Sequence, residues 1–211
     1  MPDSSSRISR RSYILASATA AAATQLLGPK ILEAAAQDRI GKLRLLTESP
    51  LNAEAKLSEL LSDYLTPLDT FYIRTNGTVP LAHEDDHRIT IEGMVSRPAV
   101  MSLLEMRKLF GETELNAVLM CAGNRRTEMS AVKKVSGTPW TTGAIGNAKW
   151  RGINLASVLN HVGVSPEAKY VWFESIDRCA KKDGTETAFG ASIPLDKALD
   201  GSTILAQSMK G

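Results

Sequence analysis

The sequence of 211 residues is poor in the side chains that staple small proteins or bind metals, with only two cysteines, Cys121 and Cys179, and three histidines. At most one disulfide can form, and the missing Cys-x-x-Cys-His motif excludes a covalently attached c-type haem. The net charge of +2 argues neither for nor against a nucleic-acid partner. However, no cluster of lysines and arginines interleaved with aromatic residues occurs, so we expect no nucleic-acid partner.

The composition is that of a protein with a packed core. Hydrophobic residues make up 43% of the chain and charged residues 23%, which are ordinary values for a globular protein. The length fits one or two domains. No internal repeat or low-complexity tract is present after the N-terminal segment.

The first 36 residues have the pattern of an export signal. A basic region at Ser9–Ile14 contains Arg10-Arg11, an uncharged Ala-rich run continues to Leu27, and Ala34–Ala36 offers a cleavage site. This is typical of a twin-arginine signal peptide. A membrane anchor is the alternative, but the apolar run is shorter than the roughly 20 residues of a membrane span. We therefore predict recognition by the twin-arginine translocase and a periplasmic location.

Patterning and capping residues predict short helices and strands after this segment. We expect residues 37–70 to be a linker and an N-terminal packing helix, with Asn52 as the N-cap of a helix over 52–65. Further helices are expected at 102–110, from a capping box to Gly111, and at 155–162, between Asn154 and Gly163. Expected strands cover 88–92, 115–120, 170–174 and 203–207, and a polar loop covers 177–184. His83 and His87 are spaced for a helical metal site, but the polar segment around them predicts solvated side chains.

The stretch from Leu115 to Ser130 carries the strongest chemical signal. An apolar run, predicted to be a buried strand, leads into Cys121, and two arginines follow within five residues. Cations beside a cysteine stabilise its thiolate, the form that binds metals, and guanidinium groups bind oxyanions in a bidentate manner. Two other uses of Cys121 remain open, namely an inert small hydrophobic residue and a disulfide with Cys179 in an oxidising compartment.

The string Cys-Ala-Gly-Asn-Arg-Arg-Thr-Glu-Met, starting at Cys121, resembles the molybdenum-ligand segment of the sulfite oxidase family. The resemblance covers roughly Phe71 to Gly211, and the further matching residues are Val132, Lys133, Gly137, Trp140, Thr142–Ile145, Trp150–Gly152 and Thr187–Leu195. It implies an α+β fold of mixed β-sheets with short helices, in which residues 71–211 form a molybdopterin-binding oxidoreductase domain.

The resemblance also implies the chemistry, which is oxidation of sulfite to sulfate by oxo transfer at a molybdenum–molybdopterin centre. Cys121 is the implied metal ligand, Arg74 and Arg126 face the substrate oxyanion, and Phe189 stands where the family carries a tyrosine near the metal. The implied cofactor contacts are Tyr72, Ile73, Asn76, Cys121 and Asp177. Because the chain has no haem motif, the implied electron acceptor is a separate cytochrome c.

Family members continue beyond the position of Gly211 with further pterin-binding residues and a dimerisation domain. We therefore expect this sequence to lack the C-terminal part of the protein, to dimerise only with that part present, and to hold its cofactor poorly without it. The alternatives to sulfite oxidation are a sulfoxide reductase of the same fold and a truncated, non-catalytic secreted domain.

Overall fold

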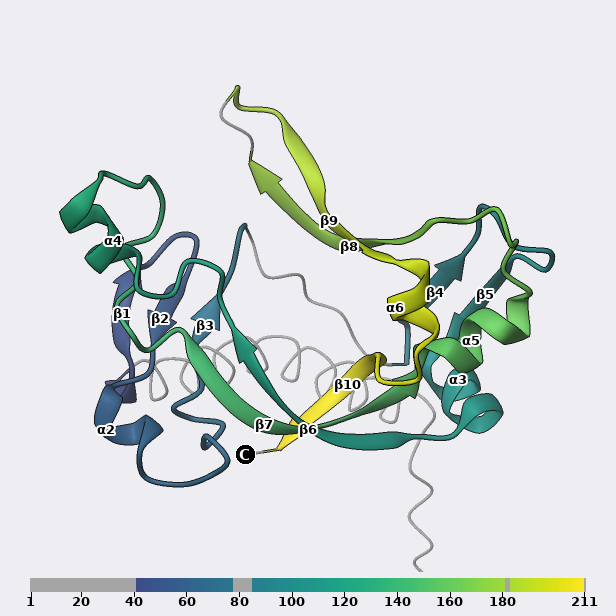
Figure 1. Cartoon of the computed structure of the whole chain (residues 1–211), viewed down its shortest axis with the longest axis horizontal. Helices are drawn as coiled ribbons and strands as arrows, with labels where there is room; N and C mark the ends of the chain where they lie inside the picture. Colours follow the sequence, from purple (N-terminus) through teal and green to yellow (C-terminus); the bar gives the residue numbers. More distant parts are fainter. Residues whose placement is uncertain (1–40, 78–84, 181–182, 211) are drawn as a thin grey trace, which may run out of the picture. The chain divides into compact units, whose positions relative to one another are not determined.

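The computed structural model describes residues 41–77, 85–180 and 183–210 (Figure 1). The predicted signal peptide and His83 lie outside these residues. Residues 43–211 form one compact unit, which contains every strand and helix from Arg44 to Lys210. No helix among the described residues is both long and apolar enough to cross a membrane.

Within the described residues the unit consists of four small sheets and short helices, which is the α+β class that the sequence predicts. One three-stranded sheet has the order β1 (Arg44–Thr47), β2 (Asn52–Glu54), β3 (Ile73–Arg74). The other has the order β10 (Ile204–Lys210), β7 (Ile145–Asn154), β6 (Thr113–Met120). The two-stranded sheets pair β4 (Arg88–Ile91) with β5 (Ala99–Ser102) and β8 (Tyr170–Ala180) with β9 (Glu186–Pro194). The helices are α2 (Leu57–Leu60), α3 (Leu103–Phe110), α4 (Arg126–Val132), α5 (Leu155–Val162) and α6 (Leu195–Leu199). Every recorded pairing between these strands is antiparallel.

The long strand β7 connects the helical core to the segment that carries Cys121. Its final residues pack with α3 and α5, where Met106, Ile153 and Val158 are buried together. Its first residues pair with the end of β6, in the register Met120↔Ile145. Figure 1 shows β6 and β7 as an extended pair that runs from α3 and α5 towards β1, β2, β3 and α4.

Local capping signals account for α3 and α5, and both predictions are confirmed. The Ser102 hydroxyl accepts a hydrogen bond from the Glu105 amide, while the Glu105 carboxylate accepts one from the Ser102 amide at 2.7 Å. The Ser102 amide, and after it the Ser102 hydroxyl, donate to the Glu105 carboxylate and lower its pKa below the usual value. Asn154 caps α5, and Gly163 ends it with φ of 69°, a conformation that glycine adopts without strain.

The predicted helix over residues 52–65 is wrong. Residues Asn52–Glu54 form β2, and only the four residues of α2 are helical. The apolar stripe that suggested a packing helix is largely exposed, at Leu57, Leu61 and Tyr64. The side chains of Asn52 and Glu54 instead bond to residues up to 87 positions away, so tertiary contacts override the helical pattern.

Two strand predictions also need correction. The strand before Cys121 exists at the edge of its sheet, but it is not buried, since Val118 is 60% and Met120 57% exposed. Residues 177–180 of the predicted polar loop at 177–184 belong to β8, within the β8–β9 hairpin that projects from the unit in Figure 1. Cys179 lies in a strand and pairs with Thr187, since the pairing resumes after a register shift between Glu174 and Arg178.

Candidate active site

Cys121 sits at the point where β6 gives way to a tight turn. Its amide donates to the Ala144 carbonyl at 2.9 Å and its carbonyl accepts from the Asn124 amide, so the backbone on both sides is fixed. The Gly123 amide points at the Cys121 sulfur, at 3.4 Å. The thiol is half-buried, and both cysteines of the chain are free. The position of the sulfur is therefore set by the backbone of the turn.

The turn leads through a strained residue into α4. Arg125 adopts the left-handed conformation, with φ of 65° and ψ of 20°, and no other non-glycine residue of the described chain has a positive φ. Such a conformation persists only where neighbouring structure imposes it. Here the Arg125 amide donates to the Thr141 carbonyl at 2.5 Å, and the Thr127 amide donates to the Trp140 carbonyl. The arm 121–127 is thus hydrogen-bonded to the returning arm 138–144.

The Arg126 guanidinium lies between two glycines. A Cβ atom on Gly123 would stand 2.6 Å from Arg126 Nη2, and one on Gly137 would stand 2.7 Å from Nη1. Nη1 donates to the Thr138 carbonyl at 2.9 Å. Among the described residues no carboxylate pairs with Arg126, whereas its neighbour Arg125 is ion-paired with Glu128. Arg126 therefore keeps its full positive charge beside the Cys121 turn.

Arg74, at the end of β3, is exposed and surrounded by neutral acceptors. Its guanidinium donates to the Thr75 carbonyl and to the Asn76 side chain, and lies 3.4 Å from Asn52 Oδ1. No carboxylate in the described part of the chain pairs with it. Its charge is therefore uncompensated, as an anion-binding group requires.

Tyr72 connects the β3 segment to Cys121. Burial and the nearby charge of Cys121 raise the pKa of Tyr72 from 10.0 to about 12, so its phenol stays protonated. The ring stacks on Phe71 and meets Trp140 edge-on, with centroids 6.3 Å apart. Trp140 is fully buried, and its indole N–H has no partner among the described residues. Tyr72 is therefore a protonated donor near the thiol, and Trp140 is its buried neighbour.

The remaining predicted site residues occupy other positions. Asn76 is bonded to Arg74, and the side chain of Ile73 packs against the small core of Leu43, Ala53 and Ala55. Asp177 and Phe189 belong to the β8–β9 hairpin, and no recorded interaction in the described chain joins either to Cys121. The hairpin reaches the Arg74 turn by its backbone, because Gly77 abuts the Arg178 carbonyl so closely that a Cβ atom would not fit.

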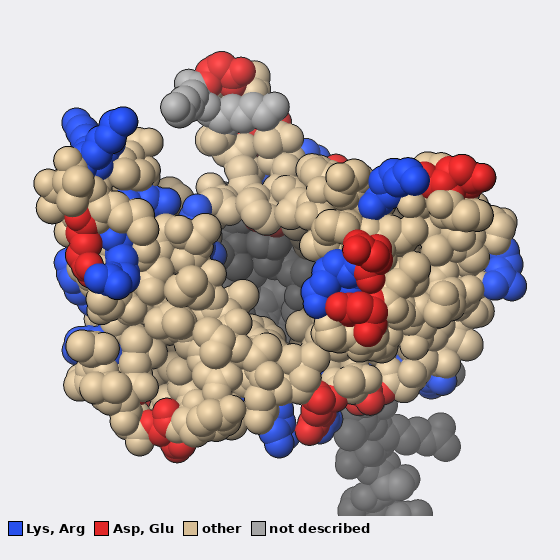
Figure 2. Space-filling model, in the orientation of Figure 1, with Lys and Arg blue, Asp and Glu red and all other residues tan. Residues whose placement is uncertain are grey.

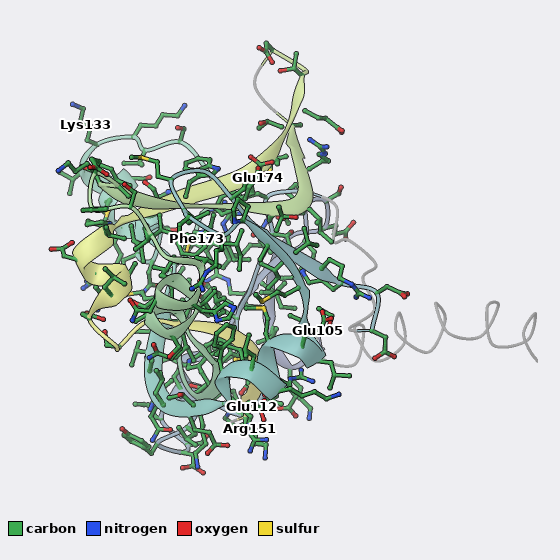
Figure 3. The ribbon with its side chains drawn as sticks, turned by 90° about the vertical axis from the view of Figure 1, so that its right-hand side faces the viewer. Glu105, Glu112, Lys133, Arg151, Phe173 and Glu174 are labelled. Carbon is green, nitrogen blue, oxygen red and sulfur yellow. The ribbon has the colours of Figure 1, made fainter. Side chains whose placement is uncertain are left out.

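Two lysines without a recognised ion pair in the described chain follow the Cys121 arm. Figure 2 shows Lys and Arg atoms over α4 and the loop after it, where Lys133 and Lys134 are exposed, whereas Arg125 is paired with Glu128. The labelled Lys133 marks this region in Figure 3, whereas Glu112 and Arg151 lie together near α3. A locally positive surface raises the concentration of small anions near it.

Sequence reasoning named Cys121, Arg126 and Arg74 as candidate site residues but did not identify the residues that hold their segments in place. Glu54 and Thr141 are joined by two hydrogen bonds although they are 87 positions apart. No local pattern announces such a pair, because each residue is ordinary within its own segment. The one available signal was an acidic residue, Glu54, between alanines in a short apolar stretch.

Comparison with known proteins gives consistent matches. A family profile described as "Oxidoreductase molybdopterin binding domain" matches residues 76–211. Sulfite oxidase of Arabidopsis thaliana is 38% identical over 179 residues, which covers 80% of this chain and 45% of that protein. Mitochondrial sulfite oxidase of Drosophila melanogaster is 41% identical over 170 residues, which covers 79% of this chain and 29% of that protein.

A solved structure agrees with these matches. The sulfane dehydrogenase SoxCD from Paracoccus pantotrophus superposes with a TM-score of 0.60 at 27% identity, over 79% of this chain and 40% of that chain. The chain spans less than half the length of each of these relatives.

Proposed function

The chain belongs to the family of oxidoreductase molybdopterin-binding domains, and from this membership we propose that it oxidises sulfite at a molybdenum–molybdopterin cofactor bound through Cys121. The family makes the chain an oxidoreductase domain with a molybdopterin cofactor. The observation that carries the finer proposal is a free, half-buried thiol in the same turn as a guanidinium that no described carboxylate neutralises.

The residues around Cys121 fit such a cofactor. A thiolate is a soft ligand suited to a thiophilic metal, and the Gly123 amide supports the negative charge on sulfur. The buried indole N–H of Trp140 has no partner among the described residues and is available to an acceptor. When bound, the cofactor supplies oxygen-atom transfer and accepts two electrons. Asn76 and Asp177 remain predicted contacts of its pterin part.

The protein's own contribution is to bind and orient the oxyanion. Arg74 and Arg126 carry uncompensated charge, and their N–H groups match the oxygens of a small anion such as sulfite. The glycines on both sides of Arg126 leave room for its guanidinium, and the bond to the Thr138 carbonyl holds it before substrate arrives, so little reorganisation accompanies binding. Tyr72 stays protonated near the thiol and can donate a hydrogen bond. Phe189, which lacks a hydroxyl, offers no such donor in β9.

We propose further that electrons leave to a separate cytochrome c and that the protein works in the periplasm. The first proposal follows from the two electrons that the cofactor must pass on, and the second is supported by the Arg10-Arg11 pair of the signal-like segment. Replacing Arg10 and Arg11 by lysine should leave the protein in the cytoplasmic fraction. Export that continues unchanged would contradict the twin-arginine route.

The direct test measures molybdenum content and sulfite-dependent cytochrome c reduction in the exported, full-length protein. Cys121→Ser should lose both the metal and the activity, because a hydroxyl does not replace a thiolate ligand. Cys179→Ser is the matched control and should retain both.

Other results would contradict the proposal. Wild-type protein without molybdenum would refute cofactor binding through Cys121. If the protein reduced sulfoxides and did not oxidise sulfite, the proposed cofactor would stand and the proposed substrate would be wrong.

A further inference from the structure

The short strand β2 carries two polar side chains that are almost completely buried. Asn52 and Glu54 are each 1% exposed, and Ala53 between them is fully buried. A buried carboxylate is costly unless it is paired and hydrogen-bonded. Strand β2 lies between β1 and β3, close to the arms that flank α4 (Figure 1). These two side chains therefore need a specific explanation.

Asn52 holds the turn that carries Arg74. Its Oδ1 accepts from the Thr75 amide at 3.1 Å and lies 3.4 Å from Arg74 Nη1. Its Nδ2 donates to Thr47 Oγ1 and to the Pro50 carbonyl, both at 2.9 Å, so the amide is fixed at both ends. Because Asn52 is neutral, it orients Arg74 without cancelling the charge of the guanidinium.

Glu54 holds the returning arm of the Cys121 loop. Oε2 accepts from the Thr141 amide at 2.8 Å, and Oε1 accepts from the Thr141 hydroxyl. The charge of Glu54 is met by Arg44, at 3.2 Å on the neighbouring strand, and not by either proposed anion-binding arginine. The next link is the Thr141 carbonyl, which accepts from the amide of the strained residue Arg125. Arg126 follows directly and begins α4.

We propose that Asn52 and Glu54 are positioning residues that set the separation of the Arg74 and Arg126 guanidinium groups. One side chain of β2 fixes the Arg74 turn, and the other fixes the arm that imposes the direction of Arg126. This inference rests on the proposed function in that the two arginines are taken to bind one small oxyanion. Neither residue touches that anion, and both act through backbone and hydroxyl groups.

The test uses variants that keep the shape of the side chain. Asn52→Asp places a negative charge beside Arg74, and Glu54→Gln puts an amide N–H against a Thr141 donor. Thr141→Val removes the hydroxyl link, while Thr141→Ser should restore it. Glu48→Gln, at an exposed carboxylate near β2, is the matched control.

Each full-length variant is characterised by its dissociation constant for sulfate by calorimetry, its KM and kcat for sulfite, its molybdenum content and its melting temperature. We expect Asn52→Asp, Glu54→Gln and Thr141→Val to weaken sulfate binding and raise KM by about tenfold to a hundredfold, the usual effect of misplacing a binding group. The value of kcat should change little, since uniform binding is what is lost. The molybdenum content of every variant should match that of the wild type. Thr141→Ser and Glu48→Gln should also match the wild type in sulfate affinity and KM.

A lower melting temperature with unchanged sulfate affinity and KM would overturn the proposal, because it would reduce Asn52 and Glu54 to structural supports. So would a wild-type protein with no measurable sulfate affinity. The sulfate measurement needs no turnover, so wild-type protein that binds sulfate but does not oxidise sulfite would refute the proposed function alone. Should Asn52→Asp fail to fold, Glu54→Gln and the Thr141 pair still decide the question.

Discussion

At the scale of single residues, the site depends on charges that are left without partners. The described arginines around Cys121 differ in this respect, since Arg125 is neutralised by Glu128 while Arg126 and Arg74 contact only neutral acceptors. Surface ion pairs contribute little to stability. The distinction therefore matters for binding an anion and not for folding.

Tyr72 provides a spectroscopic probe of the thiol. With its pKa raised to about 12, the folded protein keeps the phenol proton above the ordinary value of 10.0. The unfolding free energy should then fall as pH rises from 10.0 to about 12, because the unfolded chain loses that proton first. A phenolate absorbance titration should lose its last step in Tyr72→Phe and keep it in Tyr64→Phe. In Cys121→Ser the step should move down but stay above 10.0, since burial is the larger cause.

Gly123 should be required for function more than for stability. The methyl group of Gly123→Ala would meet the flexible end of the Arg126 side chain, 2.6 to 2.9 Å away, and would displace the guanidinium. We expect KM for sulfite to rise about tenfold, with a stability change within about 1 kcal/mol. Gly41→Ala, where a Cβ meets open space, is the control. An unchanged KM in Gly123→Ala would show that Arg126 does not bind substrate.

At the scale of elements, the capping box of α3 gives a separate prediction. Ser102→Ala removes the side-chain half of the box and should lower the unfolding free energy by about 1 kcal/mol in urea denaturation. Ser58→Ala, on the exposed side of α2, should have little effect. Equal effects of the two substitutions would contradict the importance of the cap.

The elements that could be predicted from sequence are those with local signals. Ser102 and Glu105 mark α3, and Asn154 and Gly163 mark α5, because a cap and its helix are neighbours in the chain. The helix over 52–65 was mispredicted because its pattern resembles an amphipathic helix while its polar residues bond to distant segments. The burial of β6 was mispredicted because an apolar sequence does not reveal whether other segments cover the faces of the strand.

The same distinction holds for the candidate site. Cys121 and Arg126 lie in one short string, so their chemistry could be recognised together. Glu54 and Thr141 could not, because neither shows its role until the fold brings them into contact. The interactions that fix the site are less visible in a single sequence than the groups that react.

At the scale of the whole molecule, acid should destabilise the fold gradually. Hydrogen bonds, several of them from paired lysines or arginines, lower the pKa of a set of carboxyl groups, namely Glu105, Glu114, Glu128, Glu167, Asp183 and Asp200. A carboxyl group whose pKa is lower in the folded than in the unfolded protein stabilises the fold at pH values above its unfolded-state pKa. This stabilisation is lost as the pH falls towards the folded-state pKa. The loss should begin near 4.5, the ordinary glutamate value, and end near the Asp200 value of about 2.

Urea denaturation at a series of pH values below about 6 should show this decline. Asp200→Asn should flatten the lowest part of the curve, since the pKa of Asp200 is held down by Lys197 and Ser202. Glu48→Gln should leave the curve unchanged. A stability that stays constant down to pH 3.8, the ordinary aspartate value, would contradict the prediction.

The contact between Glu54 and Thr141 also determines when the site forms during folding. The β1–β2–β3 sheet lies within residues 44–74, and the β6–β7 pair with α4 lies within 113–154, so each half closes short loops. The two halves meet through hydrogen bonds that span 87 and 97 positions. Closing such long loops is slow and entropically costly. We therefore expect the thiol turn and the Arg74 turn to form early within their own halves and the two halves to dock late, so that anion binding becomes possible only near the end of folding.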